Sequence, residues 1–137
     1  MITEDHVSFE TAKLLKEQGF DCACKAWYAE YTSQFGGEKY STIEFDNHNK
    51  FNENYKFICH APTLQKAMKW LREVHNLHCH SDYDYVMGWY CQITSLKETV
   101  EYDYEEMKHY HPEKDNGFSS PEEACEAAIK YCLENLI

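Results

Sequence analysis

The segment APTLQKAMKWLREVHNLH, residues 61–78, carries apolar side chains at the spacing of one helical face. Positions three, four, seven and eleven after the first apolar residue fall on one side of a helix with 3.6 residues per turn. The residues predicted on that face are Leu64, Ala67, Met68, Leu71 and His75. Such a face is stable only when it is buried, so the segment predicts a packed hydrophobic core.

The same spacing recurs near the end of the chain. The segment SSPEEACEAAIKYCLENLI predicts a helix, because Ser120 is a good N-cap, Pro121 suits the first turn and Glu123 completes a capping box. Its predicted inner face consists of Cys125, Ala128, Ile129, Cys132 and Leu136. A third helix is predicted between Ser8 and Gly19, since serine begins helices and glycine ends them.

The remaining segments rich in aromatic and β-branched residues predict strands. They are residues 24–32, 39–46, 55–60, 77–81, 88–96 and 99–106. The predicted class is therefore α+β, with three helices packed on an antiparallel sheet in a single domain over residues 1–137. A weak duplication of a strands-then-helix unit would explain the repeated helix spacing, but two helices on one sheet explain it equally well, and we favour the latter.

Charge and composition exclude several classes of function. The 137 residues carry a formal net charge of −11, whereas nucleic-acid binders concentrate Lys and Arg, so we expect no direct nucleic-acid binding. No apolar run reaches the ~20 residues of a membrane span. The first ten residues show no signal-peptide pattern, so we expect a cytoplasmic protein whose 7 cysteines are free thiols.

Two segments alternate acidic and aromatic residues, and they are the predicted binding surface. As strands they would place carboxylates on one face and the intervening tyrosines on the inner face. The predicted partner-binding residues are Asp82, Asp84, Glu101, Asp103 and Glu105. Like charges that lie side by side destabilise a sheet, so the patch invites an explanation, such as a basic protein partner, imitation of DNA phosphates or bound calcium. An ordinary solvated face is the favoured interpretation of the patch itself, a basic protein partner comes next, and calcium is least favoured because the EF-hand spacing is missing. If the patch has a function, we expect it to bind a basic protein.

Histidines and cysteines give an alternative function, a small metal-binding module or enzyme. His75, His78 and His80 would have to meet a cysteine in one pocket, but the paired Cys spacing of structural zinc sites is absent. Cys59 lies beside His60, yet neighbours on a strand point to opposite faces. We therefore expect no cofactor, no metal and no catalytic residue, and an activity as an interaction protein.

Self-association is a further alternative. It would use exposed aromatic residues at a dimer face, with Trp27, Tyr28, Trp89 and Tyr90 as candidates. Residues 105–117 form a polar segment without clear periodicity, which predicts a long loop.

Three segments resemble a known group of proteins. ITEDHVSFETAKLLKEQGF, APTLQKAMKWLREVHNLH and EEACEAAIKYCLENLI are similar to segments of short, functionally uncharacterised bacterial proteins associated with phages and mobile elements. The resemblance covers the three predicted helices and implies a shared scaffold. It carries no catalytic residue over to this chain.

Overall fold

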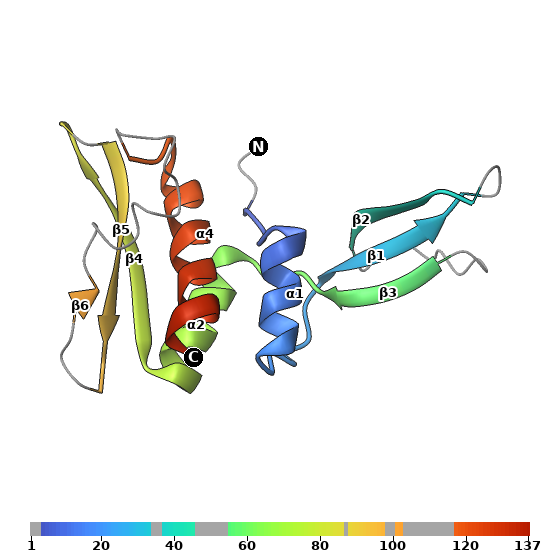
Figure 1. Ribbon diagram of the computed structural model, residues 1–137, viewed down its shortest axis with the longest axis horizontal. Helices are drawn as coiled ribbons and strands as arrows, with labels where there is room; N and C mark the ends of the chain where they lie inside the picture. The colour runs from blue at the N-terminus through green and yellow to red at the C-terminus, as the bar shows by residue number, and fades with distance from the viewer. Residues whose placement is uncertain (1–3, 34–36, 46–54, 87, 98–100, 103–116) are drawn as a thin grey trace. The chain divides into compact units, whose positions relative to one another are not determined.

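The computed structural model describes residues 4–33, 37–45, 55–86, 88–97, 101–102 and 117–137 (Figure 1). They form two compact units, His6–Pro62 and a second unit of Met1–Asp5 with Thr63–Ile137, called here the N-terminal and C-terminal units. Each unit combines helix with antiparallel sheet, so the predicted α+β class is confirmed. The single domain over residues 1–137 stays a prediction, because compactness does not show whether either unit folds alone.

The N-terminal unit begins with helix α1 (Phe9–Glu17). Its predicted cap is confirmed, since the Ser8 hydroxyl accepts a hydrogen bond from the Thr11 amide at 3.2 Å. Gln18 is the C-cap, and Gly19 follows it with a φ of +95°, which suits glycine. The amides of Gly19 and Phe20 donate to the carbonyls of Lys16 and Leu15, which is the Schellman pattern.

Three strands follow α1, and all pair antiparallel in the order β2-β1-β3. They are β1 (Ala26–Thr32), β2 (Lys39–Phe45) and β3 (Tyr55–His60). Tyr28 links this sheet to the segment before α1, because its hydroxyl donates to the Val7 carbonyl at 2.7 Å and its ring lies 5.2 Å from that of Phe9.

A β-bulge interrupts the β1–β3 pairing. Tyr28 pairs with Cys59 while the next residue, Ala29, pairs with Phe57, so Ile58 is the extra residue on β3. The bulge places Phe57 and His60 on the same face, where their rings meet edge-on with centroids 5.3 Å apart.

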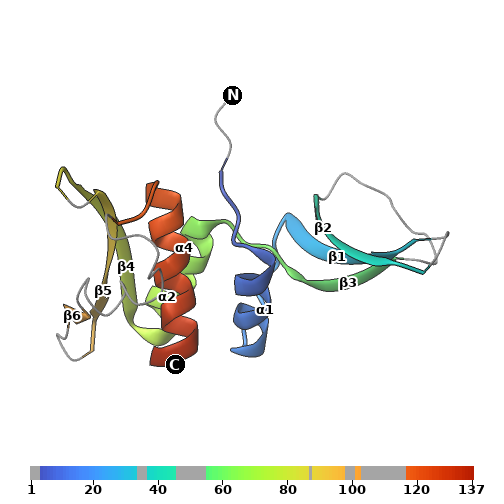
Figure 2. The ribbon, with the colours of Figure 1, turned by 45° about the horizontal axis from the view of Figure 1, so that its top comes forward.

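The C-terminal unit has its own three-stranded sheet, in the order β4-β5-β6. Its elements are α2 (Leu64–His75), β4 (Leu77–Asp84), β5 (Gly88–Ser95), β6 (Glu101–Tyr102), α4 (Pro121–Tyr131) and the π-helical turn η1 (Cys132–Leu136). Helices α2 and α4 lie on the same side of this sheet (Figure 2). No described helix combines the length and apolar character needed to cross a membrane.

The core of the C-terminal unit uses the predicted helix faces, with differences in both helices, including the burial of Ala124 and Ala127 in α4. Trp70 is also buried in α2, and His75 is only half-buried at the helix end. In the last helix Leu133 is buried and Leu136 half-buried. The π-helical turn has a longer hydrogen-bonded repeat than an α-helix, so positions after Cys132 shift around the axis.

The sheet arrangement differs from the single sheet predicted from the sequence. The strands divide into two sheets, and the strand between residues 99 and 106 is described only at Glu101–Tyr102. The two sheets also differ in strand order, because the first strand is central in one and at the edge in the other. The sheets are therefore not two copies of one topology.

Candidate functional site

Of the five predicted acidic residues, the structure brings two together. Asp82 and Asp84 are exposed and lie on one face of β4, near its end. Glu101 lies two strands away from Asp82. It pairs with Thr94, which pairs with His78, four residues before Asp82 on β4. Four residues correspond to ~13 Å along the strand direction. Asp103 and Glu105 lie outside the described residues.

The tyrosines of the first acidic segment are not inward anchors, which corrects the prediction from alternation. Tyr83 is 55% exposed and Tyr85 is 88% exposed. Tyr83 lies on the same face of β4 as the buried residues Leu77 and Cys79, because residues two apart share a face. It lies nearer the β4–β5 turn, where its ring centroid is 5.1 Å from that of Trp89. Alternation gives the face of a strand but not how far the helices cover it.

The turn after β4 exposes a further apolar side chain, Val86, at 70%. Carboxylate oxygens accept from backbone amides here, since Asp84 Oδ1 accepts from the Val86 amide after β4 and Asp82 Oδ1 accepts from the neighbouring Tyr83 amide, both at 2.8 Å. We call residues 82–86 the hairpin tip. It combines two exposed carboxylates with two strongly exposed apolar groups: Tyr85, which the sequence analysis placed on the inner face, and Val86, which it did not include.

The histidines of the alternative metal site do not converge with a cysteine. His78 and His80 stack on each other at 5.5 Å, while His75 packs on Trp70 at 4.7 Å. Cys79 lies on the opposite face of β4, where its Sγ is 3.6 Å from Cys132 Sγ. Within the described ranges, no three His, Cys, Asp or Glu side chains are grouped in a way that could hold a metal ion.

Four cysteines line the interior of the C-terminal unit. Burial is the main cause that raises the pKa of Cys91, to about 12, and that raises the pKa of Cys125. The hydrogen bond with Cys79 is the largest cause that raises the pKa of Cys132, followed by burial. Cys91, Cys125 and Cys132 are therefore neutral thiols at neutral pH, and they pack as small apolar side chains.

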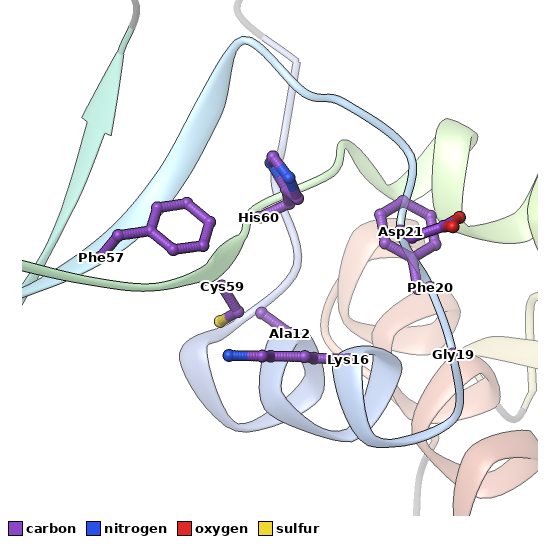
Figure 3. Close-up of a pocket in the computed structure, with 8 residues that line it drawn as sticks. All are labelled: Ala12, Lys16, Gly19, Phe20, Asp21, Phe57, Cys59 and His60. Atoms are coloured by element: carbon purple, nitrogen blue, oxygen red, sulfur yellow. The ribbon is translucent and has the colours of Figure 1, made fainter.

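A cavity of about 330 Å³ lies in the N-terminal unit, between α1 and β3 (Figure 3). The bulge positions one of the lining side chains. Lys16 Nζ donates a hydrogen bond to the carbonyl of the extra residue of the bulge, Ile58, at 2.6 Å. The lining residues are Ala12, Lys16, Gly19, Phe20, Asp21, Phe57, Cys59 and His60. They come from α1, from the segment that follows it and from the edge strand β3, so no single sequence segment could reveal the cavity.

Cys59 and His60 both line this cavity but point to opposite sides of β3, as the alternation predicted (Figure 3). Cys59 is 2% exposed. Its burial raises the pKa of the thiol, and the nearby charges of Lys16 and Lys13 oppose that shift without cancelling it. A neutral, buried thiol without a facing imidazole is a poor nucleophile.

The four aromatic candidates for a dimer face, Trp27, Tyr28, Trp89 and Tyr90, are each half-buried. Tyr28 and Trp89 also make the contacts described above within their own units. The most exposed aromatic side chain among the described residues is instead Tyr85.

Comparison with protein-family models, with curated proteins and with solved structures finds no match.

Proposed function

We propose that this protein is a small interaction module that binds a basic protein through the hairpin tip. The observation that carries the proposal is the composition of that tip. Tyr85 and Val86 are 88% and 70% exposed, and the carboxylates of Asp82 and Asp84 lie next to them in the same turn. Large apolar groups exposed in this way are typical of protein-binding surfaces.

The two parts of the tip serve different purposes. Tyrosine and valine supply contact area that is removed from water when a partner covers them, which stabilises the complex. The carboxylates attract a positively charged partner before contact, and this attraction raises the association rate and weakens with salt. The formal net charge of −11 acts in the same direction.

One hydrogen bond orders the backbone that follows β4. The Val86 amide donates to Asp84 Oδ1, while the bond from the Tyr83 amide joins it to the neighbouring residue Asp82 within the strand. A backbone segment that is already ordered loses less conformational freedom on binding, which favours affinity. The cytoplasmic location and the association with phages and mobile elements are part of the same proposal, and they rest on the sequence alone.

The charge requirement is tested with substitutions that preserve the turn. Asp82→Asn with Asp84→Asn keeps the Oδ1 acceptors and removes two charges. Glu4→Gln with Glu17→Gln removes the same charge from exposed positions that are not part of the tip. A basic partner captured with the wild-type protein is purified, and its affinity is measured by calorimetry at low salt. We expect the first variant to bind roughly tenfold more weakly and the second to change little.

The apolar requirement has its own pair of variants. Tyr85→Ser with Val86→Ser should weaken binding by roughly thirtyfold, the loss typical of a central anchor. Val74→Ser, at a 54% exposed position on α2, is the control. A partner that binds both tip variants as tightly as the wild type would show that the hairpin tip is not the binding surface.

A further inference from the structure

The cavity between α1 and β3 has a charge environment unlike that of the protein as a whole. The chain carries a formal net charge of −11, yet Lys16 lines the cavity and Lys13 is close enough to influence Cys59. Asp21 is the acidic residue among the lining side chains. Its carboxylate points away from the Lys16 amine, and no ion pair joins the two groups (Figure 3).

Lys16 retains hydrogen-bonding capacity. An ammonium group has three donors, and one of them is used by the Ile58 carbonyl at 2.6 Å. Within the described part of the chain, the other two donors have no partner. The hydrogen bond to the bulge carbonyl therefore holds the amine beside the cavity with two donors left for an acceptor.

The rest of the cavity is largely apolar. Ala12, Phe20 and Phe57 contribute hydrocarbon surface, and the Cys59 thiol adds to it because burial keeps it neutral. A volume of about 330 Å³ is at the lower end of the range for small-molecule sites. The cavity therefore suits a small molecule with an apolar body and one charged end.

His60 adds a second polar group at the lining. Its Nδ1 is buried and has no hydrogen-bond partner among the described residues. This nitrogen is out of reach of solvent, so it does not face the open volume of the cavity. The charged contact to a ligand would therefore come from Lys16.

From these observations we propose that the cavity binds a small carboxylate with an apolar body. The carboxylate accepts hydrogen bonds from Lys16 Nζ, and the apolar body lies against Phe20, Phe57 and Ala12. This site is separate from the hairpin tip and does not depend on the proposed protein interaction. Lys16 is an exposed residue, so water competes for its donors. A charged hydrogen bond is still stronger than a neutral one, so the carboxylate should determine selectivity.

The test uses two probes of matched shape and opposite charge, 3-phenylpropanoate and 3-phenylpropylamine. Each is titrated into isotope-labelled full-length protein, and amide shifts are followed by NMR. We expect saturable shifts with the carboxylate, centred on residues 12–21 and 57–60, and none with the amine. Absence of saturation up to about 20 mM, equal binding of the amine, or shifts centred elsewhere would overturn the proposal.

Variants test the role of Lys16. Lys16→Met keeps the length of the side chain and removes its charge, so the affinity for 3-phenylpropanoate should fall at least about tenfold. Lys16→Arg keeps the charge and should retain most of the binding. Lys69→Met removes the same charge from the outer face of α2 and should change the affinity less than twofold. Unchanged affinity in a folded Lys16→Met protein contradicts the proposal, and if that variant does not fold, the two probes on the wild-type protein still decide.

Discussion

The cysteines show how residue environment determines chemistry in this protein. Cys59, Cys79, Cys91, Cys125 and Cys132 are buried, while Cys22 and Cys24 are half-buried. Burial disfavours a charged thiolate, and it contributes to the raised pKa of Cys59, Cys91, Cys125 and Cys132. All seven cysteines lie among the described residues, and none of them forms a disulfide there. They are free thiols, as expected from the sequence.

The raised pKa of Cys91 predicts a loss of stability at alkaline pH. Its ordinary value of 9.0 applies to the unfolded chain, and the folded value is about 12. Between these values the unfolded thiol loses its proton while the folded thiol keeps it, so stability falls as pH rises above 9. From pH 8 to pH 10.5 this thiol alone should lower the free energy of unfolding by about 2 kcal/mol.

Urea unfolding of the wild-type protein and of Cys91→Ala at both pH values measures this effect. The alanine variant is less stable at both because of the cavity it creates, but it lacks the Cys91 contribution to the alkaline loss. Equal losses in the two proteins would mean that the Cys91 thiol ionises as easily in the folded as in the unfolded chain.

At the same scale, the sequence predicted some site residues and missed others. The exposed aspartates were predicted because charge alternation is visible in the chain. Tyr85 was wrongly predicted to face inward and Val86 was missed, although apolar residues in a turn beside two aspartates are a signal of an exposed tip. The role of Lys16 could not be predicted, because its acceptor is a carbonyl that the β3 bulge frees 42 residues later.

Helix α2 is the element whose structure follows most directly from its sequence. Its hydrophobic face was predicted from spacing, and its cap is Thr63, whose hydroxyl accepts from the Lys66 amide at 3.2 Å. Asn76 ends it in the left-handed conformation, with φ of +57°. Caps and spacing are local properties, which is why sequence analysis finds them.

Substitutions on opposite sides of α2 test that face. Leu71 is fully buried, so Leu71→Ala should lower the free energy of unfolding by about 2–5 kcal/mol through lost burial and the cavity left behind. Lys69 has a side chain that is 62% exposed and a long ion pair with Glu73 at 3.9 Å, so Lys69→Ala should change stability by less than about 0.5 kcal/mol. Denaturant melts that give both substitutions a similar cost would show that the assignment of the face is wrong.

Strands were predicted less completely than helices, for a physical reason. The alternation of residues 55–60 gave β3 its correct bounds, but alternation does not name the neighbour of a strand. Pairing depends on contacts distant in sequence, and it divides six strands into two sheets. The bulge at Ile58 and the cavity beside it depend on the same pairing, so they became visible only in the structure.

For the whole molecule, net charge is the property that the sequence gives most directly, because charged residues can be counted. Residues 78–137 contain 4 Lys and 13 Asp or Glu and so carry −9 of the formal net charge of −11. Asp82 and Asp84, two of these acidic residues, are exposed at the hairpin tip. In the N-terminal unit, the positively charged Lys16 lines the cavity, although the chain as a whole is acidic.

The central claim is that the charge of the hairpin tip guides a basic partner into contact. The most direct test is the association rate constant of the purified partner, measured by stopped flow at ionic strengths from about 20 to 300 mM. We predict that the wild-type rate falls steeply with salt, and that the Asp82→Asn, Asp84→Asn protein starts lower with a shallower slope. The Glu4→Gln, Glu17→Gln protein should follow the wild type. If all three proteins associate at the same rate with the same dependence on salt, the acidic tip does not guide binding and the account is wrong.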